Sequence, residues 1–392
     1  MVHSSDIFFY IFKLANFQIV TFISYFRAVK FLRIILFPFS ILYGCIVFVR
    51  NKFYDWGVFT SKKFDIPTIS VGNLSVGGTG KTPHIEYLIR LLKQEFYIAT
   101  LSRGYGRKTK GFILADTQSS ASDIGDEPLQ FKKKFSGLRV AVDGKRVRGI
   151  KNLLNEFPSL QTILLDDAFQ HRAVNPGLNI VLSDFSKLYT NDHILPTGNL
   201  REFKSGIKRA DIIIVTKCPE ILLPIERKRL LTEINPNANQ RVYFSYIKYG
   251  DFIRLNGEGS NPLAKDYYFE RGFSIALLTG IANTKPLEYY LKDKVKNITP
   301  IKYNDHHHFT SSDIENIRKI FNNIATANKI ILTTEKDAMR LKSAEYAEAL
   351  KNLPLFYIPI EIDFHNKDKN EFNKQIVNYV RTNQKHSSLH TK

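Results

Sequence analysis

Short apolar runs and amphipathic segments alternate along the first two thirds of the chain. Runs of β-branched and aliphatic residues predict buried strands at positions 68–71, 96–101, 112–115, 139–142, 161–165, 178–182 and 211–216. The segment after the first run places Ile85, Leu88, Ile89 and Leu92 at helical spacing. Strands that alternate with helices form parallel, doubly wound sheets, so this part of the chain is predicted to be an α/β domain.

The pattern changes after residue 240. Residues 241–251 and 267–269 are aromatic and partly alternating, and a turn rich in Gly, Asn and Pro separates them at 256–262. We interpret the two stretches as an antiparallel, two-stranded linker. A second α/β unit follows, with apolar runs at 273–278, 331–332 and 354–360 and a helical segment at 286–291. The polar residues from about 365 onward predict one helix and a frayed tail.

The first 50 residues are apolar and basic. They are rich in Phe, Ile, Leu and Tyr, and their longest uncharged run, 34–49, has sixteen residues. As a helix this run would be about 24 Å long, shorter than the roughly 30 Å hydrocarbon core of a bilayer. Pro38 and Gly44 are expected to interrupt it, and no small-residue cleavage site precedes Arg50. We predict an anchor that lies in the membrane interface on anionic headgroups, with a single membrane span as the alternative.

Composition limits the partners. The chain has 392 residues and a formal net charge of +19, from 56 Lys and Arg against 37 Asp and Glu. This excess favours an anionic partner, which could be nucleic acid, a membrane surface or a phosphorylated substrate. No helix-turn-helix, zinc or RNA-recognition pattern is present, so we expect no nucleic-acid partner. Cys45 and Cys218 form no disulfide or metal pattern, which indicates a reducing compartment.

Residues 72–83, GNLSVGGTGKTP, form the centre of the sequence. They lie between a predicted strand and a predicted helix, as in a phosphate-binding loop. Glycines let the backbone N–H groups point at phosphate oxygens, the lysine reaches the terminal phosphates, and the threonine hydroxyl is placed to bind Mg²⁺. The standard pattern has Gly where this chain has Ser75, so the loop is a variant. We assign nucleotide binding to Ser75, Val76, Gly77, Gly78, Thr79, Gly80, Lys81 and Thr82.

Carboxylates follow at positions expected for the rest of a nucleotide site. Asp166 and Asp167 come directly after an apolar strand, and one of them is expected to hold Mg²⁺ together with Thr82. Asp126 and Glu127 start a helix, where negative charge is also common for structural reasons. The turn 102–108 combines cations, a hydroxyl and an aromatic ring, and could bind an anionic sugar or simply be solvated. Three consecutive histidines, 306–308, suggest a general base more than a metal site.

The ordered set of motifs resembles the tetraacyldisaccharide 4′-kinase family, the lipid A 4′-kinases of Gram-negative bacteria. The resemblance runs from about residue 31 to 360 and is carried by residues 72–83, 101–108, 125–128, 164–171, 195–202, 305–309 and 333–338. It implies two α/β/α domains, the first with a P-loop, joined by a two-stranded linker and preceded by a membrane helix. Together with the changes in composition along the chain, it predicts five segments: an anchor at 1–50, the nucleotide-binding domain at 51–240, the linker at 241–272, a second α/β domain at 273–365 and a C-terminal helix and tail at 366–392.

The resemblance also implies an activity. Such a kinase transfers the γ-phosphate of ATP to the 4′-hydroxyl of a tetraacyldisaccharide 1-phosphate, which forms lipid IVA for lipopolysaccharide. It works at the cytoplasmic face of the inner membrane. By resemblance, Asp126 and His306 form a proton-accepting dyad beside Lys81, and Mg²⁺ is held by Thr82, Asp166 or Asp167, with Glu202 as a further candidate. Substrate contacts are expected from Ser102, Arg103, Tyr105, Arg107 and Arg201.

The sequence leaves one alternative enzyme class, a switch ATPase or GTPase at the membrane. Such proteins share the GGxGKT core but carry a signature lysine where this chain has Val76. A GTPase would also need an Asp after Thr216-Lys217-Cys218, where this chain has Pro219. Thr197 and Asn199 depart from the 4′-kinase pattern in a loop whose rigidity is affected more than its chemistry.

Overall fold

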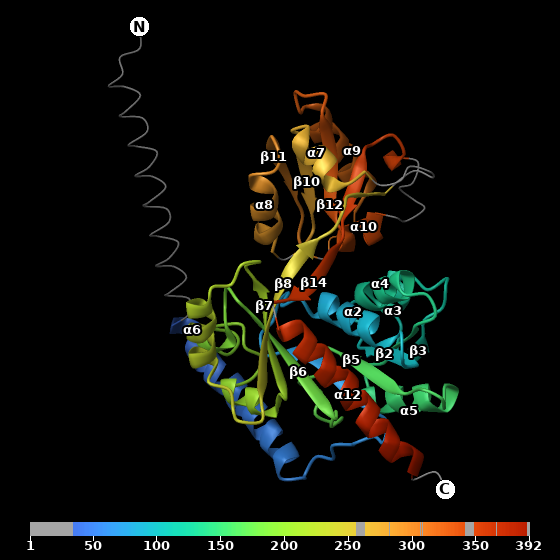
Figure 1. Ribbon diagram of the computed structural model, residues 1–392, viewed down its shortest axis with the longest axis vertical. Helices are drawn as coiled ribbons and strands as arrows, with labels where there is room; N and C mark the ends of the chain where they lie inside the picture. Colours follow the sequence, from blue (N-terminus) through green and yellow to red (C-terminus); the bar gives the residue numbers. More distant parts are fainter. Residues whose placement is uncertain are drawn as a thin grey trace.

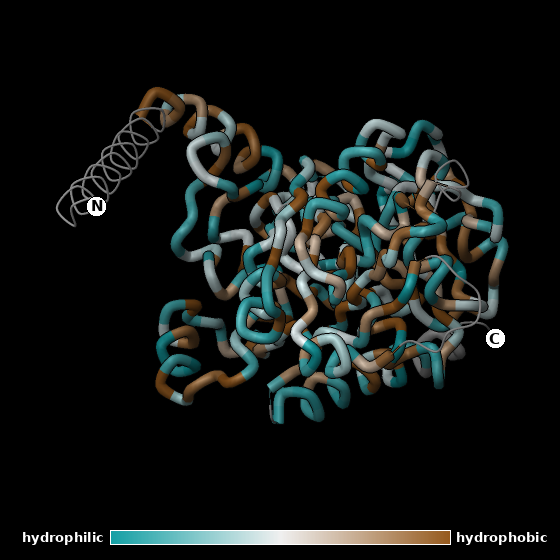
Figure 2. The backbone as a smooth tube through the Cα atoms, turned by 90° about the horizontal axis from the view of Figure 1, so that it is seen from above, coloured by the Kyte–Doolittle hydropathy of each residue, from teal (hydrophilic) through white to brown (hydrophobic). Residues whose placement is uncertain are grey.

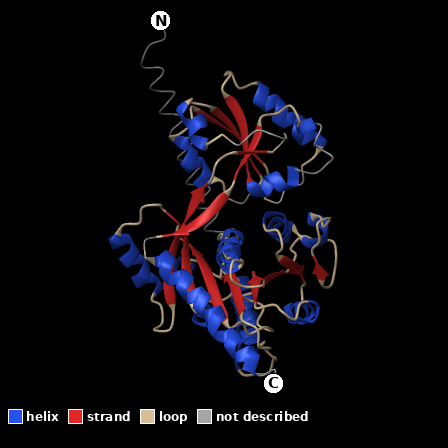
Figure 3. Ribbon diagram, turned by 45° about the vertical axis from the view of Figure 1, so that its right-hand side comes forward, coloured by secondary structure: helices blue, strands red, loops and turns tan. Residues whose placement is uncertain are grey.

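A computed structural model describes residues 34–255, 263–281, 283–305, 307, 309–341, 349–365 and 367–389 (Figure 1). Two β-sheets, each flanked by helices, lie one above the other and are connected by a pair of long strands (Figure 3). This arrangement confirms the predicted class of two α/β domains. The described fold places the phosphate-binding loop on the side of the lower sheet that faces the upper domain.

The larger sheet contains nine strands within the described residues, in the order β14-β8-β7-β6-β1-β5-β2-β4-β3. They are β1 (Thr68–Asn73), β2 (Ile98–Ser102), β3 (Ile113–Leu114), β4 (Arg139–Val142), β5 (Thr162–Asp166), β6 (Leu178–Asp184), β7 (Ile212–Cys218), β8 (Arg241–Tyr249) and β14 (Ile360–Phe364). The strands from β8 to β4 run parallel, and only the edge strands β3 and β14 are antiparallel. The carboxyl ends of β1, β5 and β7 therefore meet at one edge, where a ligand site is expected.

Helices cover both faces of this sheet. They are α2 (Lys81–Leu92), α3 (Ala121–Ile124), α4 (Asp126–Lys134), α5 (Arg146–Glu156), α6 (Pro224–Ile234) and α12 (Asp368–Leu389), with short 3₁₀ turns at Tyr189–Asn191 and Lys204–Arg209. The C-terminal helix α12 returns from the second domain and crosses the sheet beside β5 and β6 (Figure 1). Its Phe372, Ile376 and Val380 are buried in the same core as Ile180 and Ile214. The predicted C-terminal helix is thus part of the first domain's core.

The smaller sheet has the order β11-β10-β12-β13-β9. Its strands are β9 (Ile253–Arg254), β10 (Ser274–Thr279), β11 (Asn297–Lys302), β12 (Lys329–Thr334) and β13 (Leu355–Ile358), and its helices are α7 (Lys265–Glu270), α8 (Lys285–Lys292), α9 (Ser311–Asn322) and α10 (Glu335–Leu341). Four strands run parallel and β9 is antiparallel. Helix α10 begins directly after β12, at the edge that faces the first domain.

The linker is two-stranded, as predicted, but its second strand is not the predicted one. Residues 267–269 lie in helix α7, and β8 pairs instead with β14 in antiparallel register, with Tyr249 opposite Ile360. The aromatic residues of α7 favour a strand locally, yet packing overrides this preference. Tyr268 is buried among Phe252, Phe273 and Phe356, which a helical turn allows.

The N-terminal helix, Ile34–Asp55, is long and apolar enough to cross a membrane by length and composition, with 11% of its most apolar window buried. The prediction that Pro38 and Gly44 interrupt it was wrong. The described helix runs without a break through both positions, from Ile34 to Asp55. Gly44 permits a close approach, because a Cβ there would lie 2.7 Å from the Phe203 ring. Figure 2 shows brown, apolar turns of this helix at the edge of the molecule.

Candidate functional site

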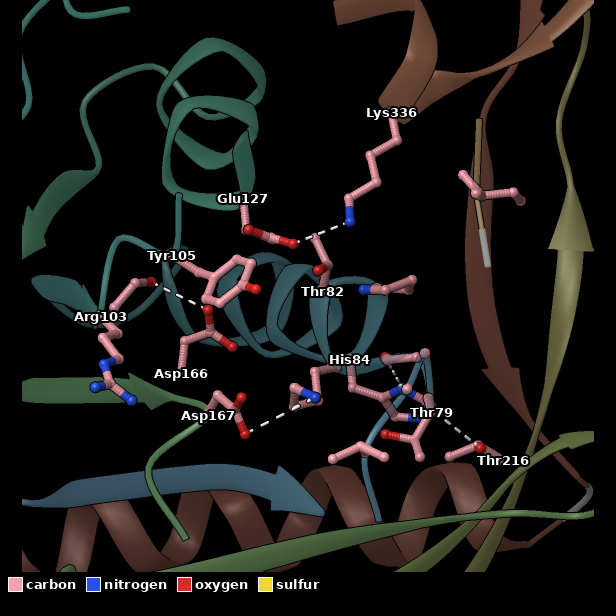
Figure 4. Close-up of a pocket in the computed structure, with 18 of the residues that line it drawn as sticks. Thr79, Thr82, His84, Arg103, Tyr105, Glu127, Asp166, Asp167, Thr216 and Lys336 are labelled. Carbon is pink, nitrogen blue, oxygen red and sulfur yellow. Dashed lines mark hydrogen bonds and ion pairs between the residues drawn. The ribbon is translucent and has the colours of Figure 1, made fainter. Parts of the chain in front are cut away.

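The phosphate-binding loop connects β1 to α2 and opens into a cleft of about 1080 Å³ (Figure 4). Gly77 and Gly80 have positive φ angles of 105° and 90°, which favour glycine and turn the backbone around the loop. Asn73, the last residue of β1, donates from its side chain to Thr79 Oγ1 at 2.9 Å. Lys81 Nζ lies 3.4 Å from Asn73 Oδ1 and 3.8 Å from an Asp167 oxygen. Asn73 thus contacts both the loop and its lysine, which lies inside the cleft.

Two residues that the sequence analysis left out of the site hold this loop from β7. The Thr216 hydroxyl donates to Thr79 O at 2.9 Å, and Lys217 Nζ donates to Gly78 O at 2.5 Å. Lys217 also pairs with Asp184 at 2.7 Å and has a left-handed φ of 57°. The Thr-Lys pair was visible in the sequence, but only as part of an incomplete GTPase motif. In the fold it supports the glycine-rich loop between β1 and α2.

The predicted carboxylate pair lies at the carboxyl end of β5. Asp166 is buried, accepts a hydrogen bond from Ser102 Oγ at 3.1 Å, and points toward Tyr105 in Figure 4. Burial, with the nearby Asp167 and Glu127 carboxylates, raises the pKa of Asp166 to about 6. Asp167 has a left-handed φ of 46°, and its side chain lies near Lys81 and Arg201 instead. These two neighbours therefore face different partners.

The side chains of Arg201 and Glu202 are both bonded to neighbouring side chains. Arg201 Nη1 donates to Asp167 at 3.0 Å, which brings this predicted substrate residue into contact with the carboxylate pair. Glu202 is buried and accepts hydrogen bonds from Arg209 at 2.9 Å, Asn51 at 3.0 Å and Gln170 at 3.1 Å. Its carboxylate is thus engaged by structural donors, although it lies on the wall of the cleft.

The turn after β2 reaches the cleft only in part. Ser102, Arg103 and Tyr105 line it, and the Tyr105 side chain is 74% exposed. Arg107 instead folds back, and its Nη2 donates to Gly111 O at 2.7 Å. The structure therefore brings three of the four predicted residues of this turn to the cleft.

The first turn of α4 faces the second domain. Asp126 pairs with Arg340 at 2.8 Å and Glu127 pairs with Lys336 at 3.0 Å, both from α10 (Figure 4 shows the second pair). His306 lies outside the described residues. Its neighbour Asp305 lines the cleft, and His307 Nε2 lies 2.9 Å from Asp313 Oδ2.

The N-terminal helix also belongs to the wall of the cleft, which the sequence did not indicate. The Tyr43 hydroxyl donates to Arg201 O at 2.9 Å and Arg50 Nη2 donates to Gln170 O at 3.1 Å. Ser40 contacts the Thr197 hydroxyl on the same loop. A helix with an exposed apolar face is thus attached through its polar face to the loop that carries Arg201.

Comparison with known proteins identifies the family. The model of the family described as tetraacyldisaccharide-1-P 4′-kinase matches residues 32–381. The chain belongs to this family. Tetraacyldisaccharide 4′-kinases of Flavobacterium johnsoniae and Bacteroides thetaiotaomicron are 46% and 45% identical over 90% of this chain, which covers 98% and 95% of their lengths. A crystal structure of LpxK from Aquifex aeolicus in complex with ATP is 27% identical, with a TM-score of 0.67 over 89% of this chain and 99% of that one.

Membership of the 4′-kinase family resolves the alternative left open by the sequence. The match spans both domains and the N-terminal helix, whereas the switch ATPase or GTPase class shares only the phosphate-binding loop. The predicted family and fold are therefore confirmed.

Proposed function

We propose that the chain transfers the γ-phosphate of ATP to the 4′-hydroxyl of tetraacyldisaccharide 1-phosphate, in lipid A biosynthesis. One observation carries the proposal beyond family membership. A single cleft is lined by the phosphate-binding loop, the Asp166–Asp167 pair, α10 of the second domain and the N-terminal apolar helix. A lipid kinase needs these elements together, because phosphate donor, acceptor and membrane must meet at one site.

Lys81 binds the β- and γ-phosphates of ATP in this proposal. Its present contacts, at 3.4 Å to Asn73 and 3.8 Å to Asp167, are long, so phosphate oxygens can replace them at little cost. The loop N–H groups and the amino end of α2 add positive potential at the same place. Thr216 and Lys217 keep the loop in this shape before the nucleotide arrives.

We assign Mg²⁺ to Thr82 and Asp166, which both line the cleft and offer oxygen ligands. Within the described residues no group of three or more His, Cys, Asp or Glu side chains could hold a metal by itself. Magnesium in kinases is usually held by one or two carboxylates together with substrate phosphates and water, so a small donor set is suitable. Burial raises the pKa of Asp166, and the nearby Asp167 and Glu127 carboxylates act in the same direction, so a bound cation would favour its ionised form. When bound, the ion neutralises charge on the phosphates.

The acceptor hydroxyl loses its proton as the phosphoryl group moves, and we assign this step to Asp126 and His306. Asp126 begins α4, whose next residue Glu127 lines the cleft, and Asp305 lines the cleft from the second domain. His307 is an unsuitable base, because it pairs with Asp313 and stacks on Tyr303 with ring centroids 4.5 Å apart. His306 then accepts the proton and Asp126 orients its imidazole.

In this proposal the site works at the cytoplasmic face of the inner membrane, and the apolar N-terminal helix supports the membrane association. At about 33 Å the helix is long enough to span a bilayer. Its polar contacts, however, extend from Ser40 through Tyr43 and Arg50 to Asp55, which pairs with Arg172 at 2.8 Å. A helix attached to the catalytic domain along most of its length cannot also be surrounded by lipid. We therefore favour an interfacial position on an anionic surface, with the exposed apolar face in the acyl region.

The test is transfer of radiolabelled phosphate from ATP to purified tetraacyldisaccharide 1-phosphate in detergent micelles. We expect transfer by the wild type and its loss in Lys81→Ala and Asp126→Ala. Asp116→Ala is the matched control, because Asp116 is exposed and bonds only with its own turn, to Gln118 and Ser119, among the contacts described. ATP hydrolysis without lipid phosphorylation by the wild type would overturn the proposal.

A further inference from the structure

The interface between α4 and α10 is built from ion pairs that join the two domains. Lys134 of α4 bonds to Glu335 at 2.8 Å, Lys336 pairs with Glu127 at 3.0 Å, and Arg340 pairs with Asp126 at 2.8 Å. Only the last pair involves a residue of the proposed proton-accepting dyad.

Arg340 has the geometry of a residue that positions another side chain. Its side chain is 7% exposed, and both Nε and Nη2 donate to Asp126 Oδ2, at 3.2 and 2.8 Å. On the other side, Nη1 donates to Asp337 Oδ1 at 3.1 Å and to Gly280 O at 3.3 Å. A planar guanidinium held at both ends has little freedom to rotate, so it defines where the Asp126 carboxylate lies.

The support behind Arg340 is itself rigid. Asp337 is fully buried and accepts hydrogen bonds from Gly280 N at 3.0 Å and from the Thr334 hydroxyl at 2.7 Å. The guanidinium is thus attached to the end of β10 and to the start of α10. Neither element belongs to the domain that carries Asp126. The position of the Asp126 carboxylate therefore depends on where the second domain lies relative to the first.

The same support adjoins the turn that carries the histidines. A Cβ atom on Gly280 would lie 3.0 Å from Asp337 Oδ1, 3.4 Å from Asn304 O and 3.7 Å from His307 Cβ. Arg340 therefore fixes Asp126 beside the end of β10. Asn304 and His307 pack against the same place. Both of these bonds from Arg340 end on Asp126 Oδ2, so they fix the carboxylate through one oxygen.

We infer that Arg340 is a positioning residue for the phosphoryl transfer. From the second domain, Arg340 fixes the Asp126 carboxylate of the first domain in the position from which Asp126 orients the proton-accepting histidine. The inference rests on the proposed function, in which Asp126 and His306 act together. It goes further by naming an interdomain contact that makes the dyad depend on the relative position of the two domains. Arg340 touches no reacting atom in this scheme.

The experiment uses the full chain in micelles with tetraacyldisaccharide 1-phosphate. Arg340→Ala should lower kcat roughly 10- to 100-fold, the worth of a hydrogen bond to a charged group, with the KM for ATP unchanged. Added guanidinium ions should restore part of kcat in this variant, and Arg340→Lys should retain more activity than Arg340→Ala because it keeps the charge but not the fork. Arg229→Ala, an exposed arginine of α6, is the matched control and should show neither loss nor rescue.

A double-mutant comparison separates positioning from a structural role. If Arg340 acts through Asp126, Arg340→Ala should add no further loss to Asp126→Asn. Lys134→Met weakens the same interface without touching Asp126. Any loss of kcat in this variant should not be restored by guanidinium ions. Wild-type kcat in Arg340→Ala, or a loss that is additive with Asp126→Asn and not rescued, would overturn the inference. Near-wild-type turnover of Asp126→Asn itself would instead refute the dyad of the proposed function.

Discussion

His84 makes the folded chain sensitive to acid. It lies in the first turn of α2, with Nδ1 2.7 Å from Gly80 O and Nε2 3.0 Å from Ser245 Oγ. A carbonyl oxygen only accepts, so Nδ1 carries the proton of the neutral ring and the Ser245 hydroxyl donates to Nε2. Burial lowers the pKa of His84 from its ordinary 6.5 to about 4, and the charge of Lys217 acts in the same direction.

The sign and size of the effect follow from linkage. The unfolded chain takes up this proton below pH 6.5, whereas the folded chain takes it up only near pH 4. Stability from the neutral ring is therefore complete above pH 6.5 and is lost progressively as the pH falls toward 4. A difference of about 2.5 pKa units, at roughly 1.36 kcal/mol each, amounts to about 3 kcal/mol.

The assay is thermal unfolding of the full chain in detergent, followed by circular dichroism, at about pH 7.5 and pH 4.5. His84→Asn keeps an N–H group near Gly80 O but cannot be protonated. It should melt below the wild type at neutral pH, because the smaller side chain packs less well. At acid pH the difference in melting temperature should narrow by roughly 3 °C. Ser245→Ala keeps the ring and should retain the acid dependence. An equal pH dependence in His84→Asn and wild type would refute the reasoning.

Three further predictions concern the site and the anchor. Lys217→Met should raise the KM for ATP roughly 10-fold, because the phosphate-binding loop loses a charged hydrogen bond and Asp184 loses its partner; an unchanged KM in steady-state kinetics would contradict this. Burial raises the pKa of Asp166 to about 6, so its ionised form destabilises the metal-free fold above that pH. Asp166→Asn should therefore melt higher than the wild type at about pH 8 but not at about pH 4, and its turnover should fall at least roughly 100-fold; equal melting at both pH values would refute it. Leu42→Asp, on the exposed face of the N-terminal helix, should reduce sedimentation with anionic vesicles, whereas Ile225→Asp on α6 should not; equal sedimentation of the two variants would argue against the anchor.

Much of the nucleotide side of the site could be predicted from local sequence. A glycine loop, a lysine and a threonine between a strand and a helix require only neighbouring residues to acquire their geometry, and Lys81 and Thr82 lie in the cleft as expected. Asp166 and Asp167 were predicted in the same way, because the residue after a buried parallel strand lies at the carboxyl edge of the sheet. The order of motifs was also sufficient to identify the family.

Contacts between distant segments were decided by the tertiary structure. The sequence favoured a strand at 267–269 by its aromatic pattern, but packing made it a helix and supplied β14 as the partner of β8. It grouped Arg107 with Arg103, yet the fold turns Arg107 away from the cleft.

The same limit applies to the residues that support the site. Hydrophobic periodicity and short motifs are local, and they report which face of an element is buried and which loop can bind phosphate. The meeting of Lys217 with Gly78, of Tyr43 with Arg201, and of Arg340 with Asp126 depends on how whole elements pack. The sequence alone thus determined the kind of chemistry, through residues that lie close along the chain. The tertiary structure alone decided which charges hold those residues in place, because these partners come together only when the sheets and helices have packed.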